Sequence, residues 1–203
     1  YPKKAKQPIK ENSLLSSFLE ETNEGYALAK ILSLKYSQHL KKKNKKEFIS
    51  LMPANLYGEG DNFDLNSSHV LPALTKKFIL AKINNHPSVQ VWGSGKVKRE
   101  FLNVEDLSNA IYFLIKNKIK YDYINIGGGE HYSIKKIAKM IKKITNYKGK
   151  IIFNTRYPDG VKRRQLDSSI INRLGWKPKI KLEVGLKNYC QYYTKEIYPY
   201  ENN

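Results

Sequence analysis

The sequence predicts a mixed α/β fold, in which short apolar strands alternate with amphipathic helices along most of the 203 residues. Two patterns support this prediction. Apolar residues recur at helical spacing in several long segments, and the runs between them are rich in β-branched and aromatic residues and end at Gly, Pro or Asn. A hydrophobic content of 40% is enough to bury a substantial core. Because such alternation is typical of crossover connections, we expect at least some parallel strand pairing.

The first half of the chain begins with a long helix that Thr22 or Asn23 could cap. A run rich in apolar residues after it predicts a buried strand, which Pro53 is expected to end. Gly93-Ser94-Gly95 then separates two further strands. Helices are expected over residues 22–43, 68–82 and 105–116, and strands over residues 47–52, 89–92 and 100–104.

The second half continues the alternation and ends in two helices. Gly127-Gly128-Gly129 follows a strand, but Tyr132 stands where a dinucleotide-binding loop would have its third spaced glycine, so we expect a turn. Ser133 is a suitable helix start, and the last few residues are expected to fray. Strands are expected over residues 121–126 and 150–153, and helices over residues 133–145, 167–173 and 183–197.

A tyrosine followed four residues later by a lysine can form an acid/base pair on one face of a helix. That spacing brings the two side chains to about 5–6 Å at Cβ, so the ammonium can stabilise a phenolate. The chain contains three such pairs, Tyr26/Lys30, Tyr112/Lys116 and Tyr132/Lys136. Random placement of this many Tyr and Lys residues gives roughly 2.4 pairs, so only their surroundings can distinguish them.

The surroundings favour Tyr26. Tyr112 lies among apolar neighbours, which predicts core packing, and Tyr132 precedes a helix whose lysines face solvent. Tyr26 follows Gly25 in the first turns of a long helix that leads to a strand, and in open α/β sheets ligands gather at the carboxyl ends of strands. A tyrosine in such a place can exchange a proton with a carbinol oxygen while hydride moves at its carbon beside a nicotinamide.

The formal charge of +19 raises the possibility of nucleic-acid binding. Its strongest support would be the basic runs at residues 41–46 and 162–164. However, the excess is spread along the chain, and the first run follows a helix, where cations complement the C-terminal dipole. We therefore expect solvated lysines and no nucleic-acid partner, and a basic nucleic-acid-binding module stays a remote alternative.

Other sequence features bear on the compartment. No run approaches eighteen apolar residues and the polar N-terminal region has no apolar stretch, so we expect neither a membrane partner nor a signal peptide. The single cysteine, Cys190, cannot form an internal disulfide, which favours a reducing, cytoplasmic location; we expect it to be a packing residue. Because the chain begins at Tyr1 and not at Met, we expect a piece of a longer protein.

Seven segments carry a more specific signal, because they occur in order along almost the whole chain. They are Glu24–Lys30, Met52–Gly58, Asp61–Phe63, Ser67–Leu74, Val91–Gly95, Arg99–Leu102 and Tyr157–Gly160. Together they resemble the GDP-L-fucose synthase family of the extended short-chain dehydrogenases/reductases, and the match runs to about residue 197. The resemblance implies an NADP(H)-dependent GDP-4-keto-6-deoxy-D-mannose 3,5-epimerase/4-reductase that makes GDP-L-fucose.

The resemblance also implies how the chain is divided. Members of the family begin with a Rossmann half that carries a Gly-rich phosphate loop, and this sequence lacks that strand, loop and helix order. Residues 1–57 would be the C-terminal part of a Rossmann-type NADP-binding domain. Residues 58–203 would mainly form the smaller α/β substrate-binding domain, with residues 98–126 returning to the Rossmann side. The family's catalytic serine and cysteine would precede Tyr1, so we expect the fragment to be inactive alone.

Roles for individual residues follow from the matched motifs. Tyr26 would donate a proton to the C4 oxygen, and Lys30 would stabilise its phenolate and bind the nicotinamide ribose. The turn Pro53-Ala54-Asn55-Leu56 would lie against the nicotinamide. His69 matches a histidine that acts as general acid/base in epimerisation and contacts the cofactor, and imidazole chemistry suits the acidic protons beside a ketone.

Four further residues match positions that bind the GDP-sugar: Lys77, Trp92, Arg99 and Asp159. The planar guanidinium of Arg99 suits a diphosphate, although a surface ion pair with Glu100 or Glu105 is an alternative. Trp92 could equally fill the core at a strand end. Lys77 stands where the family often has arginine, so it would bind phosphate without bidentate geometry.

Partners and alternatives follow from the same resemblance. It implies a GDP-sugar substrate and a homodimer that pairs through helices including the Tyr26 helix. A different NAD(P)-dependent sugar-nucleotide epimerase or dehydratase is the main alternative. Such an enzyme would share Tyr26 and Lys30 but need not use His69.

Overall fold

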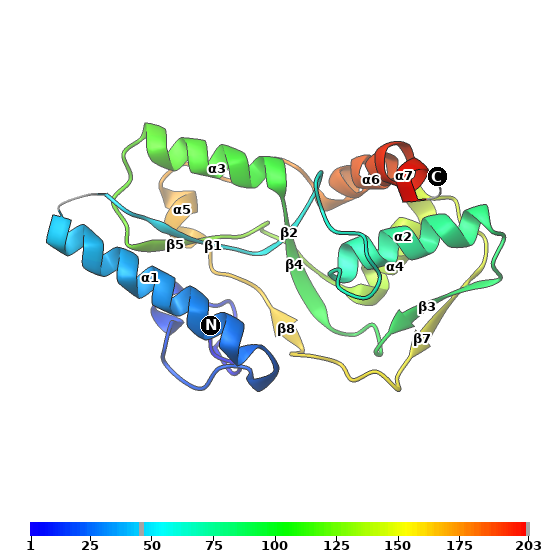
Figure 1. Ribbon diagram of the computed structural model, residues 1–203, viewed down its shortest axis with the longest axis horizontal. Helices are drawn as coiled ribbons and strands as arrows, with labels where there is room; N and C mark the ends of the chain where they lie inside the picture. Colours follow the sequence, from blue (N-terminus) through cyan, green and yellow to red (C-terminus); the bar gives the residue numbers. More distant parts are fainter. Residues whose placement is uncertain (45–46, 202–203) are drawn as a thin grey trace.

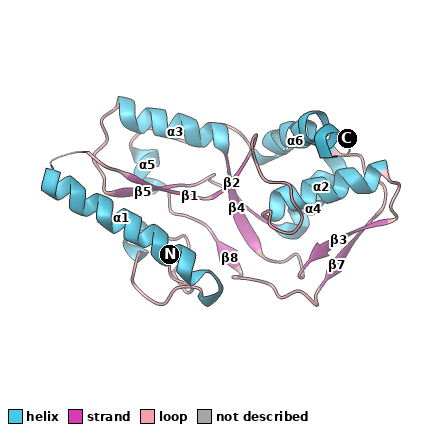
Figure 2. Ribbon diagram, in the orientation of Figure 1, coloured by secondary structure: helices cyan, strands magenta, loops and turns pink. Residues whose placement is uncertain are grey.

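The computed structural model describes residues 1–44 and 47–201 and has the predicted α/β architecture (Figures 1 and 2). In the first half, the elements are α1 (Glu24–Asn44), β1 (Ser50–Pro53), β2 (Asn55–Tyr57), α2 (Val70–Ile83), β3 (Ser88–Trp92), β4 (Lys98–Asn103) and α3 (Val104–Lys116). In the second half, they are β5 (Tyr123–Ile126), β6 (His131–Ser133), α4 (Ile134–Ile144), β7 (Lys150–Asn154), β8 (Arg163–Arg164), α5 (Ser169–Arg173), α6 (Leu182–Tyr192) and α7 (Tyr198–Glu201). Every helix in these ranges is too short or too polar to cross a bilayer.

Most strand pairs are parallel, as the alternation of elements predicts. β1 pairs with β5, β3 with β7, and β2 and β8 both with β4, while β6 runs antiparallel to β4. Parallel neighbours need a crossover, which the intervening helices provide. Strand β4 therefore has three partners and lies near the middle of the molecule (Figure 1).

Two hydrophobic clusters form the interior. The smaller one, which we call the β5 cluster, joins buried residues of β4, α3, β5 and α5 with Trp176: Leu102, Ala110, Leu114, Ile124, Ile126, Ile171 and Trp176. The larger one, the α2–α4 cluster, packs α2, α4 and α6 against strands β3 and β4. In Figure 1 the β1–β5 pair lies between α1 and α3, and α2, α4 and α6 gather at the opposite end of the molecule. The predicted boundary at residue 57 stays a prediction.

Several element predictions need correction. β1 begins at Ser50 and contains Pro53, and β2, β6 and β8 were not predicted because each has only two or three residues. Thr22 and Asn23 belong to a 3-10 turn (Glu21–Asn23) that runs directly into α1. The last predicted helix is α6 followed by a π-helical turn at Tyr193–Ile197. Lys45 and Lys46 of the basic run, and residues 202–203 where fraying was expected, lie outside the described residues.

The prediction that Tyr112 packs in the core was wrong, because its side chain is 64% exposed. Asp106, Ala110 and Leu114 are buried on α3 and recur every four residues. A helix presents only one stripe to its support, and this stripe leaves Tyr112 on the solvent side. Cys190, in contrast, is buried in the α2–α4 cluster as predicted.

The glycine turn after β5 has a steric cause. A Cβ at Gly127 would lie 2.4 Å from Oε1 of Glu100, and one at Gly128 would lie 1.8 Å from the backbone oxygen of Phe101. The latter contact cannot be relieved by a side-chain rotation. The turn thus passes so close to β4 that a side chain does not fit at Gly127 or Gly128, and Gly129 has a positive φ of 82° that favours glycine. These causes explain the three glycines without a phosphate-binding role.

We expect Gly128→Ala to lower the free energy of unfolding by about 2 kcal/mol or more, because the added methyl group meets backbone atoms. Gly25→Ala is the matched control, since a Cβ at this α1 residue has no atom within 4 Å. The control should change stability by less than about 1 kcal/mol. Urea unfolding measures both, and equal midpoints for the two variants would contradict the steric account.

Candidate functional site

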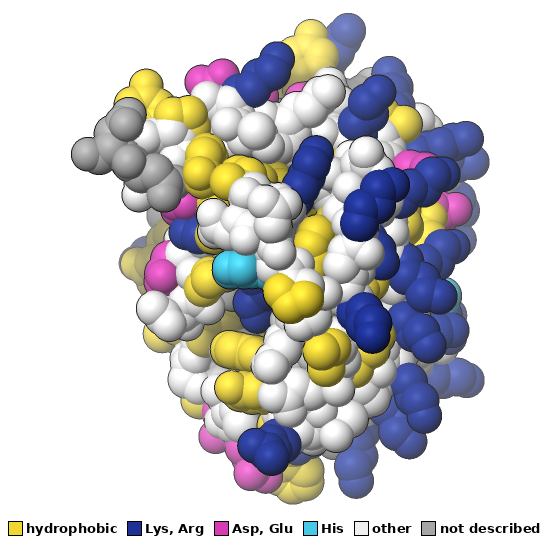
Figure 3. Space-filling model, turned by 90° about the vertical axis from the view of Figure 1, so that its right-hand side faces the viewer, with side chains coloured by type: hydrophobic (Ala, Val, Ile, Leu, Met, Phe, Trp, Pro, Cys, Tyr) yellow, Lys and Arg dark blue, Asp and Glu magenta, His cyan; other side chains and the backbone are white. Residues whose placement is uncertain are grey.

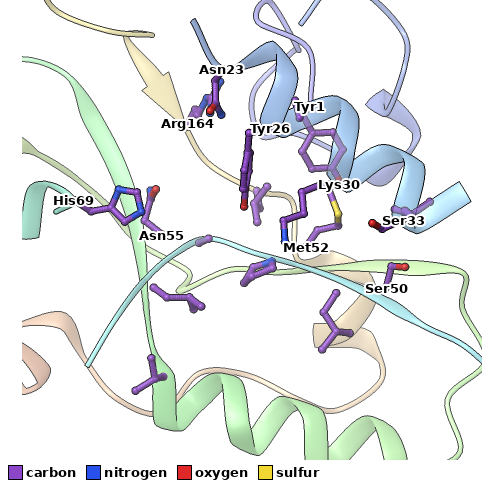
Figure 4. Close-up of a pocket in the computed structure, with 18 of the residues that line it drawn as sticks. Tyr1, Asn23, Tyr26, Lys30, Ser33, Ser50, Met52, Asn55, His69 and Arg164 are labelled. Carbon is purple, nitrogen blue, oxygen red and sulfur yellow. The ribbon is translucent and has the colours of Figure 1, made fainter. Parts of the chain in front are cut away.

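A cavity of about 1100 Å³ lies between α1, the β1–β2 segment and the segment that contains β8 (Figure 4). Seven residues predicted from the sequence line it: Tyr26, Lys30, Pro53, Ala54, Asn55, Leu56 and His69. They come from a helix, from the ends of two strands and from the residue before α2. The structure therefore brings together every predicted catalytic and cofactor-binding residue.

Tyr26 and Lys30 extend from the first turns of α1 toward β1 (Figure 4). The Lys30 Nζ atom is 5.5 Å from the centroid of the Tyr26 ring, as expected for residues four apart on one helical face. The Tyr26 side chain is 62% exposed, so a ligand in the cavity can reach it. The pair has the arrangement needed for proton donation by a phenol next to a cation.

The β1–β2 turn is fixed by backbone bonds at the carboxyl end of a parallel strand pair. The N–H of Ala54 donates to the carbonyl oxygen of Ile126 on β5 at 2.9 Å. The side-chain amide of Asn55 donates to the carbonyl oxygen of Glu100 on β4, also at 2.9 Å. The turn is thus held rigidly against both neighbouring strands, at the edge where open α/β sheets bind ligands.

His69 occupies the position before α2 with an extended backbone, and its imidazole forms no capping bond to the helix. In Figure 4 the ring lies beside Asn55. The preceding loop is folded on Asp64, whose carboxylate accepts from the Ser67 hydroxyl at 2.7 Å and whose carbonyl oxygen accepts from the Ser68 N–H. This local network places an exposed imidazole at the cavity wall.

The predicted substrate residues form a second group that does not line the cavity. Trp92 stacks on Tyr157 with ring centroids 4.4 Å apart, and the Lys77 Nζ atom lies 4.8 Å from the centroid of the Trp92 ring. Because Trp92 is 55% exposed, the core-filling alternative is wrong. Burial lowers the pKa of Lys77. The group therefore offers an exposed aromatic surface flanked by a cation.

Asp159 fixes the loop beside this aromatic pair. Its carboxylate accepts from the Ser94 N–H at 2.9 Å and from the Ser94 hydroxyl at 2.5 Å. The hydroxyl bond is the main cause that lowers the pKa of Asp159. Asp159 thus holds the Gly93-Ser94-Gly95 turn in the conformation that presents Trp92.

Arg99 is held by backbone carbonyls. Its Nη1 atom donates to the oxygen of Val161 at 2.7 Å and to that of Lys98 at 2.9 Å. Within the described ranges, no ion pair joins Arg99 to Glu100 or Glu105, so the alternative role is not found. Burial and the charge of Arg164 lower the pKa of Arg99.

Arg164 is a cavity residue that the sequence analysis missed. It lies directly across from Arg99 in the parallel β4–β8 pair, so both side chains lie on the same side of the sheet. It also lines the cavity with Tyr26 (Figure 4), and thus links the cavity to the substrate group. Its position a few residues after the matched segment Tyr157–Gly160 could have identified it as a site residue. The run 162–164 was instead interpreted as solvated surface.

The comparisons with known proteins agree with this geometry. Residues 1–127 match the family model described as "NAD dependent epimerase/dehydratase family". The chain is 48% identical over 197 residues to a GDP-L-fucose synthase of Sinorhizobium fredii, covering 97% of this chain and 63% of that protein. It thus spans less than two thirds of the length of the curated relative.

Two solved structures show the same fold. A GDP-6-OMe-4-keto-L-xylo-heptose reductase from Campylobacter jejuni superposes with a TM-score of 0.88 at 35% identity, covering 97% of this chain and 68% of that one. A GDP-L-fucose synthetase from Naegleria fowleri bound to NADP gives a TM-score of 0.85 at 28% identity, covering 99% and 64%. From the family match over more than half of its length and from these relatives, we conclude that the chain belongs to the NAD-dependent epimerase/dehydratase family.

Proposed function

We propose that the chain is part of an NADPH-dependent GDP-4-keto-6-deoxy-D-mannose 3,5-epimerase/4-reductase, which makes GDP-L-fucose. The convergence of Tyr26, Lys30, Asn55 and His69 on one cavity carries the proposal. Support comes from the 48% identical GDP-L-fucose synthase and from the NADP-bound structure of a similar fold. Because relatives extend beyond the matched region, the activity is proposed for the whole protein.

The cavity has the groups that a nicotinamide cofactor needs. Lys30 offers an ammonium to a ribose, and the β1–β2 turn presents ordered backbone groups beside it. NADPH, when bound, supplies the hydride that reduces C4 of the keto-sugar. Tyr26 then gives its phenolic proton to the C4 oxygen, so that the carbonyl becomes an alcohol, and Lys30 stabilises the phenolate that forms.

His69 is suited to the epimerisation. Protons at C3 and C5 lie beside the C4 ketone and are acidic enough to be removed by an imidazole. Its ring is exposed and makes no capping bond, so it is available for transferring these protons. A second acid on the opposite face of the sugar, which the resemblance places before Tyr1, then returns a proton to each carbon and gives the 3,5-epimer before reduction.

The substrate group and its surroundings suit a GDP-sugar. Arg99 and Arg164 are partners in the β4–β8 register, so two arginine side chains share one side of the sheet, which suits a diphosphate. Trp92 and Tyr157 offer aromatic surface. No Asp or Glu occurs between Glu130 and Asp159. Figure 3 shows Lys and Arg crowded along one side of this end of the molecule. Such a field raises the local concentration of an anionic substrate.

A reductase acting on a different GDP-sugar is the second candidate. It is favoured by the TM-score of 0.88 to the heptose reductase, whose name also specifies a GDP-linked keto-sugar. Both candidates would use Tyr26 and Lys30, and they differ in the sugar. Assays with GDP-4-keto-6-deoxymannose and with a GDP-keto-heptose distinguish them by which one drives NADPH oxidation.

We expect the chain to bind GDP, and Arg99→Ala to weaken that binding at least about tenfold, because one charged hydrogen bond to phosphate contributes about 1.5–3 kcal/mol. Calorimetric titration with GDP measures this effect. Lys139→Ala is the control, since Lys139 is an exposed α4 residue and its replacement removes the same charge from the same end of the molecule. Equal losses for the two variants, or no binding by the unaltered chain, would contradict a specific GDP site.

For the reaction, the protein is expressed with any coding sequence that precedes Tyr1 in its gene. We expect Tyr26→Phe to slow NADPH oxidation about 10²–10⁴-fold, because the proton donor is lost, while deuterium exchange from solvent into the sugar continues. Tyr112→Phe is the matched control, since Tyr112 is also exposed and has Lys116 5.8 Å from its ring centroid. Full activity of Tyr26→Phe would refute the proposed role.

The exposed face of α1 supports a homodimer. Leu28, Leu32 and Tyr36 are 51%, 69% and 60% exposed and lie four residues apart, so they form one apolar stripe. We expect Leu32→Glu to shift sedimentation from dimer to monomer, because a charge would be buried in the interface. Ile83→Glu, at the exposed end of α2, should leave the dimer intact. If the unaltered protein sediments as a monomer at all concentrations, the proposed dimer is wrong.

A further inference from the structure

Glu100 is a buried carboxylate that does not line the cavity but contacts the segments that carry its walls. Its side chain is 2% exposed. One carboxylate oxygen accepts from the N–H of Gly129 at 3.0 Å and the other from the N–H of Leu166 at 2.7 Å. Within residues 1–44 and 47–201, no lysine, arginine or histidine forms an ion pair with it. Backbone N–H groups thus stabilise the carboxylate, although burial still raises its pKa.

These bonds join segments that pass from one hydrophobic cluster to the other, which we call crossings. β4 is one of them, since Phe101 belongs to the α2–α4 cluster and Leu102 to the β5 cluster. Gly127–Gly129 leads from β5 to β6, and Leu166 lies between β8 and α5. A fourth segment, β2, is held through the Asn55 amide, which donates to the Glu100 carbonyl oxygen. The carboxylate of Glu100 therefore joins two of these segments to β4, and its backbone carbonyl oxygen joins β2.

The crossings carry groups from both parts of the candidate site. Asn55 lies in the turn proposed to contact the nicotinamide. Arg164, two residues before Leu166, lines the cavity and is paired in register with Arg99. Glu100 thus attaches β2, through its backbone carbonyl oxygen, and the segment after β8, through its carboxylate, to one position of β4.

The surrounding structure is shaped around this carboxylate. A Cβ at Gly127 would lie 2.4 Å from Oε1 of Glu100, so a larger residue would displace it. The Ser168 hydroxyl accepts from the Gly127 N–H at 2.8 Å and closes the same corner. The corner is thus complementary to a glutamate in a single position.

We propose that Glu100 is a positioning residue that fixes the cofactor side of the site relative to the substrate side. This proposal rests on the proposed function for the identity of the ligand, but not for the geometry. Gln is the informative replacement. It has the same shape, but its NH₂ group would face a backbone N–H donor, so one of the two bonds must be lost.

The first test measures the relative position directly. Spin labels on Lys35→Cys in α1 and Lys139→Cys in α4, both exposed, report the distance between the two parts by double electron–electron resonance. Cys190 can stay, because burial raises the pKa of its thiol to about 12 and makes it unreactive. We expect a narrow distribution for the labelled protein and a broadened or shifted one with Glu100→Gln. The exposed Glu196→Gln is the control with the same charge change.

A GDP titration provides the functional readout. We expect Glu100→Gln to bind GDP about tenfold more weakly, because the arginines are no longer held in place, while Glu196→Gln binds as the unaltered chain does. If the unaltered chain binds no GDP, the proposed function fails and the label distances still decide the positioning role. A Glu100→Gln variant with unchanged distances and unchanged affinity would overturn that role.

If Glu100→Gln does not fold, amide hydrogen exchange of the unaltered protein tests the same role. Gly129 is exposed, so its amide would exchange fast without a stable acceptor. We expect the amides of Gly129 and Leu166 to exchange as slowly as those of β5, that is, only through global unfolding. Fast exchange at both sites, by local opening, would show that Glu100 does not hold the crossings together.

Discussion

The structure depends on β4, a strand that belongs to both hydrophobic clusters at once. Its neighbouring residues Phe101 and Leu102 point into different clusters, because successive side chains of a strand face opposite sides. The same strand pairs with β2, β6 and β8. The turn beside the cavity and the segment that carries Arg164 are therefore both attached to one backbone, and neither can move without breaking bonds to it.

Much of the fold and of the site could be predicted from the sequence, since the signals were local. Helical periodicity identified α1, and the spacing of Tyr26 and Lys30 placed both on one face. What could not be predicted depends on tertiary packing. Strands of two or three residues have no periodicity of their own, and Tyr112 is exposed because Ala110 and Leu114 define the inner stripe of α3. Arg164 was missed because its role depends on pairing with a distant strand.

The site combines a rigid framework with a strong positive field. Its polar anchors are carboxylates and amides bound to backbone groups: Asn125 is fully buried and donates to the carbonyl oxygens of Ile9 and Asp167. Asp106 similarly accepts from the N–H groups of Lys179 and Ile180. The acidic residues among them are therefore used inside the molecule, and the cations remain at the surface. In the proposed diphosphate region, the carboxylate of Asp159 is taken up by the N–H and hydroxyl of Ser94. Among the described residues it forms no ion pair with Arg99.

The stacked position of Trp92 has an optical consequence. The chain has two tryptophans, and the other, Trp176, is 7% exposed in the β5 cluster, whereas Trp92 is 55% exposed. A soluble quencher can therefore reach one indole and not the other. The tryptophan fluorescence of the protein therefore has one component from Trp92 in the proposed substrate group and one from Trp176 in the β5 cluster. The molecule thus carries its own pair of fluorescent reporters, one at the proposed substrate group and one in the interior.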